Sequence, residues 1–213
     1  MYSSKGNPQC SFTATAQWTA NTYTVSYNGN GNTGGSTDSS SHTYDTAKTL
    51  TTNGFTRTGY SFSGWNTKSD GSGTAYTDGQ SVSNLTSTNG GTVTLYAQWT
   101  INSYTLTVNK GNNISSVSGG GTKNYNASCS ISATPNTGYK FINWTGYSTS
   151  TDNPYTFNMP ASNATYTANA QGVSYTVVYH SNGGTGTMTN SSHTYGTAST
   201  LSKNAFAKTG YSF

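Results

Sequence analysis

The stretch that decides the fold opens with YTVSY at Tyr23–Tyr27, continues with GYSFSGW at Gly59–Trp65 and closes with LYAQW at Leu95–Trp99. It begins again near the C-terminus, where Ser191–Phe213 aligns with Ser40–Phe62 and about two-thirds of the positions are identical. Internal repetition of this kind indicates an array of similar modules, each built around its own small core. The repeat therefore has to be interpreted before any single residue.

The repeat divides the chain into four segments. Residues 22–100 form one complete module, and residues 103–171 form a second that is related in style but different in sequence. Residues 1–20 are interpreted as the tail of a preceding repeat, because TATAQW at Thr13–Trp18 matches the closing strand of the first module. Residues 174–213 are interpreted as the truncated start of a further repeat.

The pattern within the modules predicts a mainly β fold. Tyr23–Tyr27 alternates apolar and polar side chains, as a half-buried strand does. Clusters of Asn, Gly and Asp separate such runs and predict turns. One short helical turn is expected at Gly79–Leu85, where Val82 and Leu85 are spaced three apart.

Aromatic side chains are expected to form most of each core. The chain has 17 Tyr, 7 Phe and 4 Trp, whereas only 7% of its residues are charged and none is Glu. Each aromatic ring buries a large apolar area, which compensates for the small size of the modules. The aromatics predicted to be buried in the first module are Tyr60, Phe62, Trp65, Tyr96 and Trp99. Those predicted to be exposed in the second are Tyr147 and Tyr155.

Charge and cysteine content exclude several classes of function. The formal net charge is +4, but the basic residues are scattered singly, so no nucleic-acid partner is expected. No apolar run approaches the length needed to span a bilayer, so direct membrane insertion of this segment is not expected. Cys10 and Cys129 lie in different segments without the spacing of a metal or redox motif, and we interpret them as unrelated.

The order of the motifs resembles a known family. GYSFSGW at Gly59–Trp65, DGSGTAY at Asp70–Tyr76 and LYAQW at Leu95–Trp99 are similar to the hallmarks of the Listeria–Bacteroides repeat, or internalin B-repeat. Residues 103–171 resemble a divergent form of it. The resemblance implies β-grasp-like modules from a large secreted protein of the bacterial cell envelope, used as stalk or interaction modules. It implies no catalytic, cofactor-binding or metal-binding residues.

Five acidic residues are the candidates for a catalytic or metal site. Asp70 and Asp78 are the only plausible pair for the two carboxylates of a glycoside hydrolase, and both precede glycine in predicted turns. The same two residues fall short of the several carboxylates of a calcium loop. The interpretation as turn residues is favoured for the full set, which is Asp38, Asp45, Asp70, Asp78 and Asp152. No metal site and no cofactor are expected.

Two histidines are candidates for a catalytic role. His42 and His193 occupy the same place in two copies of Ser-Ser-His-Thr-Tyr. A position that recurs with the scaffold is more typical of structure than of catalysis, and no nucleophile-elbow motif accompanies it. We therefore expect no enzymatic activity.

Two functions remain open at this stage. The first is a non-enzymatic structural spacer or stalk, with a possible role in adhesion, whose partners are the neighbouring repeats of the same chain. The linkers Thr100–Asn102 and Gly172–Val173 are too short for flexible tethers, so neighbouring modules are expected to hold a fairly fixed orientation. The alternative is a module that binds a host or cell-wall glycan or protein through exposed aromatic rings.

Overall fold

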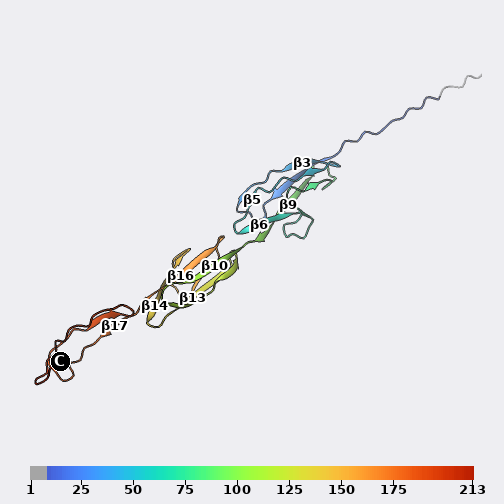
Figure 1. The fold of residues 1–213 in the computed structure, drawn as a ribbon. Helices are drawn as coiled ribbons and strands as arrows, with labels where there is room; N and C mark the ends of the chain where they lie inside the picture. The colour runs from blue at the N-terminus through green and yellow to red at the C-terminus, as the bar shows by residue number, and fades with distance from the viewer. Residues whose placement is uncertain (1–8) are drawn as a thin grey trace, which may run out of the picture. The chain divides into compact units, whose positions relative to one another are not determined.

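The computed structural model describes residues 9–213, and these residues form strands and turns with no helix among them (Figure 1). The prediction of a mainly β fold is confirmed. Contacts divide the chain into two compact units. The first contains the chain up to Arg57 together with Phe62–Trp99, and the second contains Thr58–Ser61 together with Thr100–Phe213.

The first module is built on a five-stranded mixed sheet with the order β3-β1-β9-β6-β7. Its strands are β1 (Thr22–Asn28), β3 (Ser40–Thr43), β6 (Tyr60–Asn66), β7 (Ala75–Tyr76) and β9 (Thr92–Ile101). The first and last of these, β1 and β9, pair in parallel, with Tyr27 opposite Leu95. β3 pairs with β1 in the antiparallel sense and places His42 opposite Tyr23. This order fits the β-grasp-like arrangement implied by the resemblance.

Two short strand pairs complete the first module. β2 (Gly34–Gly35) pairs with β5 (Phe55–Thr56), and β4 (Lys48–Thr49) pairs with β8 (Ser81–Val82). The helical turn expected at Gly79–Leu85 is therefore wrong. Spacing of two apolar residues by three positions is weak evidence for one turn, and here the backbone of Ser81–Val82 finds its hydrogen-bonding partner on β4.

The core of the first module is aromatic at its centre. Trp65 is 1% exposed and contacts the rings of Tyr27, Phe55 and Phe62. Trp99 is only half-buried at the edge of the same cluster, where its ring packs edge-on against Phe62. The buried members of this cluster are Tyr23, Val25, Leu50, Trp65, Val82, Leu95 and Ala97.

Two of the aromatics expected in this core lie outside it. Tyr60 and Tyr96 are half-buried, and neither belongs to the cluster. In a strand with one buried face, alternate side chains turn away from the core, and Tyr96 lies between the buried Leu95 and Ala97 of β9. Tyr60 belongs to the second unit, where its ring has a different partner, described below.

The second module repeats the sheet order of the first. Its four-stranded sheet has the order β12-β10-β16-β14, and a second sheet has the order β11-β13-β15. β10 and β16 pair in parallel, as β1 and β9 do, and they lie side by side in Figure 1. The strands are β10 (Ser103–Lys110), β11 (Ile114–Ser118), β12 (Gly121–Asn124), β13 (Ser128–Pro135), β14 (Tyr139–Gly146), β15 (Tyr155–Asn158) and β16 (Ala164–Gly172).

The core of the second module also centres on a tryptophan. Trp144 is fully buried, and its indole Nε1 donates a hydrogen bond to the Asp152 carbonyl oxygen at 3.0 Å. Tyr147 is 55% exposed, as expected. The expectation of exposure at Tyr155 is wrong, because this ring packs against the core, 5.9 Å from the ring of Tyr166.

The C-terminal segment has less regular structure than the complete modules. β17 (Ser174–Val177) pairs with β18 (Ser191–Thr194) in the antiparallel sense, and a single bridge joins Thr185 to Ala207. His193 on β18 is 6% exposed. This hairpin reproduces the β1–β3 pair of the first module.

Candidate functional site

The two acids that could have formed a catalytic pair serve turns instead. Asp70 accepts a hydrogen bond from the backbone N–H of Ser72 at 3.0 Å, and this bond lowers the pKa of the Asp70 carboxyl. Asp78 accepts one from the backbone N–H of Asn53 at 2.8 Å. Both carboxylates are exposed to solvent, whereas a general acid needs a partly desolvated carboxyl group.

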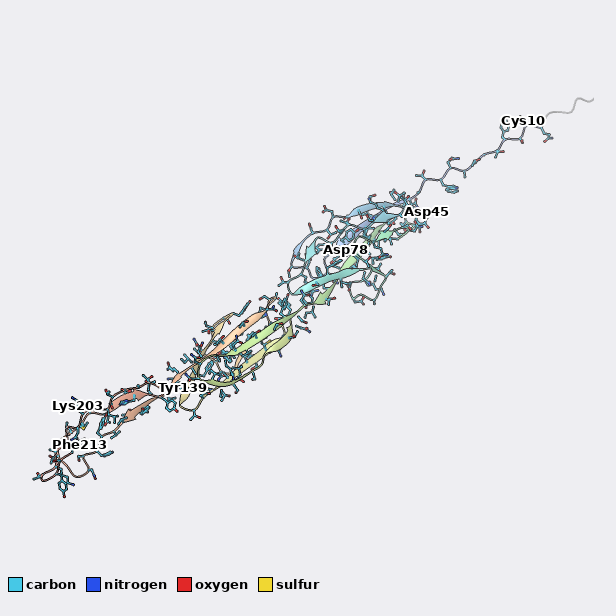
Figure 2. The ribbon with its side chains drawn as sticks, viewed as in Figure 1. Cys10, Asp45, Asp78, Tyr139, Lys203 and Phe213 are labelled. Carbon is cyan, nitrogen blue, oxygen red and sulfur yellow. The ribbon has the colours of Figure 1, made fainter. Side chains whose placement is uncertain are left out.

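The other acids are equally exposed. Asp45 and Asn84 are joined twice, since the Asp45 backbone N–H donates to the Asn84 side chain and the Asn84 amide donates to the Asp45 carboxylate at 2.8 Å. Figure 2 shows Asp45 and Asp78 at separate places in the first unit. Among residues 9–213, no group of three or more His, Cys, Asp or Glu side chains gathers as metal ligands would.

His42 is buried beneath an aromatic ring. It is 1% exposed, its ring lies 5.4 Å from that of Tyr23 at an interplanar angle of 21°, and its Nε2 lies 2.8 Å from Ser40 Oγ. Burial lowers the pKa of His42, and the charge of Lys48 lowers it further. The neutral imidazole is thus the form that the fold accommodates.

His193 has the same surroundings in the C-terminal copy. Its ring stacks on Tyr175 at 5.8 Å and 22°, and its Nε2 lies 2.7 Å from Ser191 Oγ. The serine partner was not identified from sequence, although the signal was present, because side chains two apart on a strand lie on the same face. Ser40 and Ser191 each stand two residues before the histidine.

The Ser–His pair is not arranged for nucleophilic catalysis. A catalytic triad needs an acid on the second imidazole nitrogen to orient the ring and stabilise its charge. In the first module Nδ1 of His42 has no hydrogen-bond partner within the described part of the chain, and the ring is closed off from solvent. Ser40 and His42 both lie on β3, so the pair is a structural element that holds the His42 ring against Tyr23 of β1.

The cysteines occupy unrelated positions. Cys10 is exposed in the N-terminal segment (Figure 2), and Cys129 is 2% exposed within the core of the second module. Cys129 fills apolar space on β13. Both are free thiols.

A shallow groove lies on the first module. Its volume is about 360 Å³, and it is lined by the side chains of Trp65, Tyr76, Gln80 and Gln98, among others. The Trp65 indole N–H has no hydrogen-bond partner within residues 9–213. An aromatic ring beside amide groups offers both a stacking surface and hydrogen bonds, which are the groups that a polar ligand requires.

The most exposed aromatic rings lie in the partial repeats. Trp18 is 91% exposed, and its counterpart Trp99 is half-buried; Phe213 is fully exposed, and its counterpart Phe62 is half-buried. In the complete module, the strands that cover these positions are present. The exposure of these rings alone does not define a ligand platform.

Comparison with known families agrees with this architecture. The Listeria–Bacteroides repeat domain matches residues 23–98 and 175–213, and the divergent InlB B-repeat domain matches residues 104–171. The chain belongs to the Listeria–Bacteroides repeat domain family. Repeat domains of these families are typically non-catalytic and are common in bacterial surface proteins.

One curated relative provides context for the repeat. A protein of Evansella cellulosilytica described as a Gly-rich membrane protein is 56% identical over 48 residues, which is 22% of this chain and 6% of that protein. The chain thus spans a small fraction of the relative's length. No solved structure matches the chain. Within residues 9–213 there is no helix with the length and apolar character needed to cross a membrane.

Proposed function

We propose that this chain is a structural spacer or stalk segment of a protein of the bacterial cell envelope, and that its repeats act without catalysis. The observation that carries the proposal is the shared sheet order of the two complete modules. Two modules of different sequence place their first and last strands in parallel at the centre of the sheet. What the modules have in common is architecture, because no pattern of site residues is common to both.

The histidine, aspartate and tryptophan side chains make structural contacts, and this supports the proposal. The buried histidines stack on tyrosines and bond to serines. Asp70 accepts a hydrogen bond within its turn, and Asp78 accepts one from the backbone of Asn53. The large rings of Trp65 and Trp144 are each buried in the core of one module. Repeats with short linkers contact mainly their neighbours, and this property suits a spacer.

Small-angle X-ray scattering on the full chain tests the spacer. A compact globule of 213 residues has a radius of gyration of about 17 Å. A spacer is expected to exceed this value clearly, with a maximum dimension well above that of a globule of equal mass. A radius of gyration near the compact value would contradict the proposal.

The groove on the first module favours a second candidate, the binding of a glycan. Tyr76 supplies a half-buried ring there, and the amides of Gln80 and Gln98 supply donors and acceptors. Retention of the full chain on an array of host and cell-wall glycans tests this candidate. Gln98→Ala is expected to abolish the retention and the exposed Tyr147→Ala to preserve it, whereas no retention on any glycan would exclude it.

A further inference from the structure

A Gly-Tyr turn recurs at Gly59-Tyr60, Gly138-Tyr139 and Gly210-Tyr211, and in the first two the tyrosine is the first residue of a strand, β6 or β14. We propose that this turn is a connector that locks one repeat to the next by receiving a tyrosine from the following repeat. The inference deepens the proposed spacer function and rests on it, because it names the partner as a second repeat of this family and identifies the residues that hold it. Both examples of the occupied connector lie within the second unit.

The connector at Gly138 consists of a ring contact and a backbone bridge. The Tyr195 ring lies directly on Gly138, so that a Cβ at position 138 would come within 2.4 Å of it. Tyr139 meets Tyr195 edge to face, with the ring centroids 5.4 Å apart at 88° (Tyr139 is labelled in Figure 2). The backbone N–H of Val173 donates to the Gly138 carbonyl at 2.9 Å, and that of Tyr195 donates to the Val173 carbonyl at 3.0 Å.

The connector at Gly59 has the same geometry. A Cβ at position 59 would lie 2.1 Å from the Tyr125 ring, and the rings of Tyr60 and Tyr125 meet edge to face at 6.1 Å and 78°. The backbone N–H of Asn102 donates to the Gly59 carbonyl at 2.9 Å, and that of Tyr125 donates to the Asn102 carbonyl at 2.8 Å. The Ser61 hydroxyl adds a bond of 2.7 Å to the Asn102 side chain.

Glycine is required in this turn for two reasons. Its φ is +76° at Gly59 and +83° at Gly138, in the left-handed region that other residues adopt only at a cost. A side chain would in addition occupy the space of the incoming ring. The connector is thus recognised by the absence of a Cβ and the presence of an edge-to-face ring pair, which contributes about 0.5–1.5 kcal/mol beyond its buried area.

The two connectors join different kinds of repeat in different order. At Gly59, a Listeria–Bacteroides repeat precedes a divergent repeat, and at Gly138 the divergent repeat precedes another Listeria–Bacteroides copy. The linker residue differs as well, Asn102 in one and Val173 in the other, because only its backbone groups take part. The connector therefore forms in both orders of the two repeat types.

The two elements of the connector occur again, the turn in the C-terminal copy and the tyrosine in the first module. Gly210 has φ +80° and nothing within 4 Å of a Cβ built on it, and Tyr211 is 73% exposed. Tyr44 corresponds to Tyr125, since its backbone N–H donates to the Asn21 carbonyl at 2.8 Å. Gly210-Tyr211 thus has the backbone of the turn, and Tyr44 has the position of the tyrosine that such a turn receives.

Hydrogen exchange of the full chain tests the connector with matched glycine variants. Gly138→Ala is expected to raise the exchange rates of the Val173 and Tyr195 amides at least tenfold, because the added methyl group displaces the Tyr195 ring. Gly210→Ala is the control: it imposes the same strain at φ +80° where nothing is displaced, and it is expected to leave both rates unchanged. Gly59→Ala and Gly90→Ala, at φ +76° and +72°, form a second matched pair. Gly59→Ala is expected to raise the exchange rate of the Asn102 amide, and Gly90→Ala is expected to leave it unchanged.

Tyr195→Ala separates the connector from a general loss of folding. It adds no atom to the turn, so Val173 is expected to exchange faster while the buried Trp144 amide keeps its rate, and Tyr195→Phe is expected to restore the wild-type rate at Val173. Unchanged exchange at Val173 in both Gly138→Ala and Tyr195→Ala would overturn the proposal, and so would equal acceleration in Gly138→Ala and Gly210→Ala. If Gly138→Ala also raises the exchange rate of the Trp144 amide, that variant has lost folding more generally, and the result with Tyr195→Ala is then the test of the connector. The two proposals can fail separately. If scattering gives a compact radius of gyration while hydrogen exchange gives the expected result, the spacer proposal is rejected and the connector proposal stands.

Discussion

The imidazole ring of His42 lies nearly parallel to the phenol ring of Tyr23, across the antiparallel pair of β1 and β3. The same relationship holds between His193 and Tyr175 in the C-terminal copy. Each histidine also meets a serine hydroxyl on its own strand, so the ring is fixed from two sides. Burial lowers the pKa of His42, which makes the stability of the β1–β3 pair sensitive to protonation of this ring.

Stability of the first module is expected to fall as the pH decreases below about 6.5. Because the pKa of His42 is lowered in the folded state, the unfolded chain binds more protons as its own imidazole titrates near 6.5. The contribution of His42 is thus complete above pH 6.5 and is lost as the pH falls through the folded-state value. Urea unfolding between about pH 7.5 and pH 5, above the range of the carboxylates, measures this change.

Two variants isolate the contribution of His42 to that pH dependence. His42→Phe keeps a buried ring without a titrating group, and it is expected to flatten the pH dependence. His180→Gln removes an exposed histidine and is expected to leave the pH dependence as in the wild type. Equal pH dependence in wild type and His42→Phe would show that other groups are responsible.

Trp65→Ala is expected to destabilise the first module by about 3–5 kcal/mol, the usual range for a fully buried aromatic residue. Trp99→Ala is expected to cost less, because Trp99 is half-buried, although the loss also removes the 2.9 Å hydrogen bond from its indole Nε1 to the Gly29 carbonyl. Urea denaturation of the full chain measures both. The exposed Tyr147→Ala serves as the control, and a smaller effect for Trp65→Ala than for Trp99→Ala would contradict the burial argument.

The sequence predicted the strands and the central tryptophan well because both depend on local alternation. Tyr23, Val25 and Leu95 could be assigned to the core from a period of two, and they are buried. It could not predict the partners of Tyr60, since that ring turns away from its own core and meets Tyr125, which lies far along the chain. Contacts between repeats have no local pattern that reveals them.

Among the candidate site residues, too, local features could be predicted from the sequence and contacts between strands could not. Glycine next to Asp70 and Asp78 correctly predicted turns, since Asp commonly bonds to a backbone N–H within or beside a turn. The partnership of His42 with Ser40 and Tyr23 needed the register of β1 and β3, which a single sequence does not specify. The groove near Gln98 is formed by side chains from separate strands and was not predicted.

Calcium at millimolar concentration is expected to leave the melting temperature of the chain unchanged. A ligand that binds only the folded state must raise it. Asp70 and Asp78 are both exposed and already accept backbone hydrogen bonds from Ser72 and Asn53. Thermal melting with calcium and with chelator measures the difference, and Asp70→Asn provides the comparison. A rise of several degrees in the wild type that Asp70→Asn removes would establish a calcium site.

The segment Tyr175–Phe213 is expected to exchange its amide hydrogens faster than Tyr23–Trp99. It contains the β17–β18 hairpin but no equivalent of Trp65 or of strand β9, so its apolar face is left without most of its cover. An isolated two-stranded hairpin is at best marginally stable in water. Protection is therefore expected only at Ser174–Val177, at Ser191–Thr194 and at the connector amide of Tyr195, and hydrogen exchange followed by mass spectrometry measures it. Protection of the whole segment at the level of Tyr23–Trp99 would contradict this expectation, because it would show that the hairpin and the connector suffice to fold a partial repeat.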